Sequence, residues 1–224
     1  MRKLNLLAVG ATVALLTAAS AAGAQTYSNG PNSGNISSFG FPDTQTYGEV
    51  FTAQTSGNLS SFSMFLGSAI GGTLYGGIGA WNCGASYAAN CGESSALYDS
   101  SPVAADHAGT YTFAPNVALT AGSVYVAYLS VFGANNSGQS TTSMPLGSGG
   151  GGFDYFVFNN SNNGPHSSNW NYFSNFGNAR LDLTFEPSAG GVPEPTSWAL
   201  MLLGFGGLGA VLRSSRRNGA VLAA

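Results

Sequence analysis

Charged residues are scarce in this chain, since lysine, arginine, aspartate and glutamate make up 7% of its 224 residues. Basic residues are rarest in the long middle part. Between residues 25 and 187 there are eight acidic residues and a single basic one, Arg180, so this part has a net charge of −7. A nucleic-acid-binding protein needs several lysines or arginines to neutralise phosphates, so this distribution argues against a nucleic-acid partner.

Histidine and cysteine are also scarce, with two of each. The histidines, His107 and His166, lie in turn-like sequences and accompany no catalytic motif such as G-x-S-x-G. A structural zinc site takes about four ligands, which these residues do not supply in a recognisable spacing. We therefore expect no catalytic residues, no metal and no cofactor. A secreted hydrolase acting on glycosides through paired carboxylates ranks third among the functions considered.

The first 24 residues have the order of a secretory signal peptide. Two basic residues are followed by an apolar run and then by the small-x-small site Ala22-Gly23-Ala24. We predict that signal peptidase cuts after Ala24, so that the mature chain begins at Gln25. The protein is then exported across the inner membrane.

The two cysteines, Cys83 and Cys91, both lie in the predicted exported part, eight positions apart. A redox-active pair more typically has the spacing C-x-x-C. Outside the cytoplasm, two cysteines that are close in sequence usually pair. We therefore expect a disulfide that closes a small loop.

Residues 25–187 have the pattern of a single all-β domain. The clearest strand is 179–186, where apolar and polar residues alternate before Pro187 ends the run. Clusters of Gly, Asn, Pro and Ser separate further short runs, which favours an antiparallel β-sandwich or jelly roll. The other strands are expected near 47–53, 61–66, 74–81, 111–113, 123–132 and 153–158, with 123–132 central and with long loops at 133–152 and 159–169.

After a linker at 188–192, residues 193–195 read Pro-Glu-Pro. An apolar run at 196–212 follows, and as a helix it would be about 25 Å long, which is the short end of a membrane span. Three arginines at 213–217 follow the run and are expected on the cytoplasmic side, which places the β domain outside. A short uncharged tail at 218–224 ends the chain.

This segment resembles the PEP-CTERM sorting signal, in the variant with Trp-Ala after the tripeptide. The resemblance implies that an exosortase, a membrane cysteine protease, processes the chain near the tripeptide. The protein then passes from a transient membrane anchor to the cell surface or an extracellular polysaccharide matrix, usually in a Gram-negative bacterium. Members of the family commonly end soon after the arginines, whereas this chain continues. The matching residues are Pro193, Glu194, Pro195, Trp198, Ala199, Gly204, Phe205, Gly206, Arg213, Arg216 and Arg217.

Two functions are favoured for the β domain. The first is a non-catalytic structural or adhesive role on the surface or in the matrix. The alternative is a carbohydrate-binding module that recognises exopolysaccharide, because sugars stack on exposed aromatic rings. The same rings could instead fill the core, as most aromatic residues in a domain of this size do. The candidate sugar-binding residues are Trp170, Tyr172 and Phe173 in a loop-like stretch, and Trp81 near the cysteines.

Overall fold

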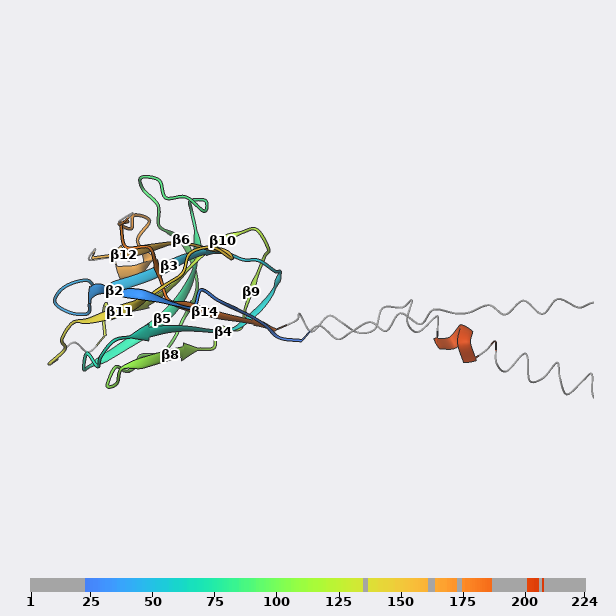
Figure 1. Cartoon of the computed structure of the whole chain (residues 1–224), viewed down its shortest axis with the longest axis horizontal. Coiled ribbons are helices and arrows are strands. Elements are labelled where there is room, and N and C mark those ends of the chain that lie inside the picture. The colour runs from blue at the N-terminus through green and yellow to red at the C-terminus, as the bar shows by residue number, and fades with distance from the viewer. Residues whose placement is uncertain are drawn as a thin grey trace, which may run out of the picture. The chain divides into compact units, whose positions relative to one another are not determined.

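The computed structural model describes residues 23–134, 137–160, 164–172, 175–186, 201–205 and 207. The described residues up to Glu186 belong to one compact unit, which is made of strands (Figure 1). The elements are β1 (Gln25–Ser28), β2 (Pro31–Phe39), β3 (Thr46–Thr52), β4 (Gly57–Leu66), β5 (Thr73–Trp81), β6 (Glu93–Asp99), β7 (Val103–Ala104), β8 (Gly109–Phe113), β9 (Val117–Leu119), β10 (Val124–Ser130), β11 (Thr142–Gly147), β12 (Phe153–Asn159), the 3-10 helix η1 (Gly164–His166), β13 (Asn178–Ala179) and β14 (Leu181–Glu186).

The strands form three sheets whose pairings are antiparallel, which confirms the predicted all-β class. The five-stranded sheet has the order β1-β14-β4-β8, with β9 beside β4. The six-stranded sheet has the order β12-β3-β10-β5-β6, with β7 beside β5, and the three-stranded sheet has the order β13-β11-β2. In the five-stranded sheet the first strand of the domain pairs with the last, and Gln25 lies opposite Phe185.

One apolar core is shared by all three sheets, with side chains such as Ile36 from β2, Phe62 from β4 and Phe156 from β12. Strand β10 lies between β3 and β5, as expected for the run at 123–132. Its alternate residues point to opposite faces, so Ala127 packs in the shared core while Tyr128 joins a second apolar cluster on the outer face of the sheet.

The predicted strand 179–186 alternates as expected but is divided at Arg180. Residues before the break pair with β11, whereas those after it pair with β4 in a different sheet. The Arg180 guanidinium lies 3.8 Å from the centre of the Phe65 ring, so the single basic residue of the domain is half-buried against an aromatic face. The buried residues of the alternation are Ala179, Leu181, Leu183 and Phe185.

The stretch 133–152, predicted as a loop, contains β11. This strand pairs with β2, and its Met144 side chain is fully buried in the core. The ladder shifts register on both sides of the Met144–Pro145 pair. A proline and glycine-rich flanks made this short strand resemble a loop in the sequence.

A buried acid connects two of the sheets. Glu49 on β3 is fully buried, and its carboxyl accepts hydrogen bonds from the Asn178 side chain and, at 2.8 Å, from the Ala179 backbone N–H on β13. Burial raises the pKa of Glu49 well above its ordinary value, and these two hydrogen bonds oppose the rise. The contact holds β13 against the six-stranded sheet.

Candidate functional site

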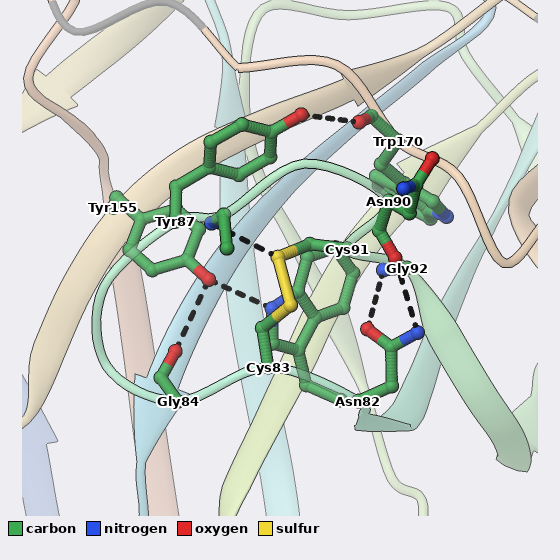
Figure 2. Close-up of a disulfide and its surroundings, with 11 residues drawn as sticks. Asn82, Cys83, Gly84, Tyr87, Asn90, Cys91, Gly92, Tyr155 and Trp170 are labelled. Carbon is green, nitrogen blue, oxygen red and sulfur yellow. Dashed lines mark hydrogen bonds between the residues drawn. A yellow bond between two sulfur atoms is a disulfide. The ribbon is translucent and has the colours of Figure 1, made fainter.

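Two loops cover the outer face of the six-stranded sheet. One is residues 82–92, between β5 and β6, and the other is residues 164–172, after β12. A disulfide joins Cys83 to Cys91 and closes the first loop, as the cysteine spacing predicted (Figure 2). Cys91 is fully buried, so the bridge is part of the packing under the loop.

Backbone and side-chain hydrogen bonds connect the two loops (Figure 2). The backbone N–H of Trp170 donates to the Cys91 carbonyl at 2.6 Å, and the Tyr87 hydroxyl donates to the Trp170 carbonyl at 3.0 Å. Within the first loop, the Asn82 side chain accepts from the Gly92 N–H and donates to the Asn90 carbonyl. The loops therefore form one cover over the sheet.

Both candidate tryptophans are buried beneath this cover. Trp170 is 0% exposed and Trp81 is 6% exposed, and their rings meet edge to face at 5.7 Å. The Trp170 indole N–H donates to the Pro165 carbonyl at 3.0 Å, and that of Trp81 donates to the Tyr155 hydroxyl at 2.8 Å. Neither indole can stack on a sugar in this structure, so that prediction is wrong for both. The outer face of the sheet is apolar, and the indoles shield it from water.

Tyr172 remains a candidate for sugar binding. It is half-buried and stacks on the half-buried Tyr87, with ring centres 4.7 Å apart and planes inclined by 24°. Phe173, the fourth predicted residue, lies outside the described residues.

A polar cluster beside these loops has no counterpart in the sequence-based predictions. His166 in η1 lies between two acids of β6, with Nδ1 2.7 Å from a carboxylate oxygen of Glu93 and Nε2 3.2 Å from one of Asp99. The Tyr128 hydroxyl donates to Asp99 at 2.6 Å. His166 is exposed, as interpreted from the sequence, and it also clamps η1 to β6.

Glu93 is the buried member of this cluster. Its side chain is 1% exposed, burial raises its pKa, and the hydrogen bond from His166 opposes the rise. Its second oxygen, Oε1, has no hydrogen-bond partner among the described residues. Two glycines on β5 make room for the cluster, because a Cβ on Gly79 would lie 2.2 Å from that oxygen and one on Gly77 2.2 Å from the Tyr128 ring.

The polar groups of this cluster contact one another. Both imidazole nitrogens of His166 face carboxylate oxygens, so neither is available to take a proton from a substrate. In the part of the chain that the structure describes, no three His, Cys, Asp or Glu side chains are placed to hold a metal ion. The arrangement supports a structural clamp between η1 and β6.

Replacing His166 with alanine should lower the free energy of unfolding by about 1–2 kcal/mol at pH 7, because Glu93 would lose its partner while buried. Without His166 the pKa of Glu93 rises further. When the pKa of a group is higher in the folded state than in the unfolded state, the folded protein binds more protons at pH values between the two. Stability therefore falls as the pH rises from the unfolded-state pKa to the folded-state pKa. The loss should therefore be larger at neutral pH than near the ordinary pKa of glutamate, about 4.3.

Thermal unfolding followed across this pH range measures the effect. His107→Ala is the matched control, because that histidine is exposed and its acid partner, Asp106, is 74% exposed. The control should stay within about 0.5 kcal/mol of the wild type. An equal loss in both variants, or a loss for His166→Ala that does not depend on pH, would contradict the clamp.

In the second unit, residues 201–205 and 207 are helical, and they include Gly204 and Phe205 of the predicted sorting signal. None of the helices in the described residues is long and apolar enough to cross a membrane. Most of the predicted span at 196–212 lies outside the described residues. The same holds for Pro193, Glu194, Pro195, Trp198, Ala199, Gly206, Arg213, Arg216 and Arg217.

The family model described as the PEP-CTERM protein-sorting motif matches residues 191–217. The chain carries a PEP-CTERM sorting signal. This confirms the assignment made from the tripeptide, the apolar run and the arginines. The signal implies export, processing by an exosortase, and sorting to the cell surface or the extracellular space.

No curated protein matches this PEP-CTERM chain. Among solved structures, it is similar to "The crystal structure of the cysteine protease and lectin-like domains of Cwp84, a surface layer associated protein of Clostridium difficile", with 10% sequence identity and a TM-score of 0.42. The match covers 64% of this chain and 32% of that one, so the chain spans only a third or so of that protein. This similarity is too low to assign either the fold or the activity of that protein to this chain.

Proposed function

We propose that the β domain is a non-catalytic structural or adhesive module that an exosortase delivers to the cell surface or extracellular matrix. The observation that carries the proposal is the sorting motif at 191–217, which follows directly on the β domain. A signal peptide cut after Ala24 starts the route, and a membrane span at 196–212 holds the protein until it is processed.

The structure of the domain supports a scaffold role. The two larger sheets share one core, which favours the predicted β-sandwich, and a disulfide and a histidine clamp hold the covering loops. The polar groups of the His166 cluster make contacts with one another.

Replacing Pro193-Glu194-Pro195 with three alanines should leave uncut protein in the membrane fraction, whereas the wild type is shortened and reaches the surface or medium. The reason is that the tripeptide is the part of the signal near which the protease cuts. Fractionation of host cells with intact-mass measurement tests this. Alanines at Ser188 and Gly190, in the linker before the matched motif, provide the control and should be processed normally. If the wild type and the tripeptide variant had the same mass and occurred in the same fraction, the segment would be a membrane anchor and not a sorting signal.

Carbohydrate binding is the second candidate function. The observation that favours it is the stacked, half-exposed pair of Tyr87 and Tyr172, with the exposed amides of Asn90 and Asn171 in the same two loops. Binding of the exported protein to the host's exopolysaccharide, compared with the Tyr172→Ala variant, distinguishes this candidate from a purely structural role.

A further inference from the structure

The six-stranded sheet ends in a bare edge at β6. This strand pairs with β5 on one side, and among the described residues no strand pairs with its other side. Residues 94–97 are all exposed, and since successive residues point to opposite faces of a sheet, the strand is uncovered on both faces. His166 contacts Glu93 and Asp99 at the two ends of β6 and leaves the middle bare. A bare edge offers backbone N–H and C=O groups to another strand.

The other sheet edges differ from this one. At the opposite edge of the same sheet, Phe158 of β12 exchanges two backbone hydrogen bonds with Asn171, at 3.0 and 2.8 Å. In the five-stranded sheet, β1 has four residues, and β8 has five, with alternate residues buried. In the three-stranded sheet, the edge strand β2 has five exposed residues in a row, 31–35, but none of them is a large apolar residue. Among these edges, β6 combines an exposed run with an exposed large apolar side chain, Leu97.

The chemistry of the edge suits a second copy of this chain. The domain is strongly acidic, so two copies repel each other, yet residues 94–98 carry no charge. Three large apolar side chains are exposed in the described part of the domain, and two of them, Leu97 and Val103, lie along this edge. Val103 belongs to β7, which pairs with β5 beyond the end of β6. Exposed apolar side chains thus coincide with an uncharged stretch between the two acids that end β6.

We propose that β6 pairs with β6 of a second copy, joining two six-stranded sheets across a two-fold axis. A strand that meets its own copy about a two-fold axis perpendicular to the sheet runs antiparallel to it, and each patch faces an identical patch. Register shifts between β5 and β6 limit the regular stretch, so the pairing is short and the dimer reversible. Such a contact acts between molecules concentrated on one surface. This inference rests on the structural role proposed above, and it adds that copies of the domain associate through β6.

Sedimentation of the full chain in a neutral detergent tests the pairing without relying on sorting. The wild type should show a monomer–dimer equilibrium. Leu97→Asp should weaken it about tenfold or more, because two added acids would face each other across the axis. Thr112→Asp, an equal charge change on the exposed face of β8, should leave it unchanged.

Cysteine cross-linking in host cells gives the second measurement. Single cysteines at Ser94, Ser95, Ala96 and Leu97 should yield dimers on a non-reducing gel, most strongly at the residue nearest the axis, and a cysteine at Thr110 should not. A wild type that stays monomeric, a dimer that survives Leu97→Asp, or equal cross-linking at Thr110 would overturn the proposal. A failure of the sorting experiment with the dimer intact would instead count against the proposed function alone.

Discussion

Leu183→Asp should lower the free energy of unfolding by several kcal/mol, enough to unfold a domain of ordinary stability. Leu183 on β14 is 3% exposed and lies opposite Phe62 in the shared core, so the new carboxylate would be buried without a partner. Thermal unfolding followed by circular dichroism measures the loss.

Thr184→Asp is the matched control for this substitution. Thr184 is the next residue of the same strand and is half-exposed. It lies between Thr26 and Ser61 on the solvent-facing side of the sheet. Its effect should stay near 0.5 kcal/mol, as for most surface substitutions. A slip of one residue would exchange the two faces, so the opposite ranking of the two variants would show that the register is wrong.

Trp170→Ala should destabilise the domain by about 3–5 kcal/mol, the usual range for removing a buried aromatic side chain. The ring is fully buried between Trp81 and Tyr128, and its loss would leave a cavity beneath the covering loops. For a domain of this size, each kcal/mol lowers the melting temperature by about 2–4 °C. Thermal unfolding again gives the measurement.

The control for Trp170 is Tyr172→Ala, two residues along the same loop and half-exposed, which should cost clearly less. If Trp170→Ala melts like the wild type, the indole is not packed as the structure shows. The hypothesis that Trp170 stacks on a sugar would then be open again.

Local patterns were enough to predict the parts of the fold that depend on alternation. The buried set around Leu183 follows from period two in the sequence, and the central position of β10 follows from its apolar residues on both faces. The sorting signal was also recognisable, because its parts occur in order within one short segment.

The features that the sequence did not reveal depend on partners far along the chain. His166 meets Glu93 73 residues away, and no motif links the two. Arg180 divides the last strand because its neighbours pair with different sheets. Trp170 looked like a loop aromatic, since nothing in its local sequence shows that the outer face of the sheet also needs a cover. Each of these depends on tertiary packing, which overrides local pattern.

The pairing of β1 with β14 sets an order of events during export. Thr26 and Thr184 are neighbours in the sheet, although 158 residues separate them in the chain. A polypeptide that crosses the membrane from its N-terminus delivers β1 first and β14 last. The five-stranded sheet therefore closes only after translocation of the whole domain, because contacts so distant in sequence form late. The sorting segment follows β14 in the chain, so it reaches the membrane only after the last strand of this sheet has been delivered.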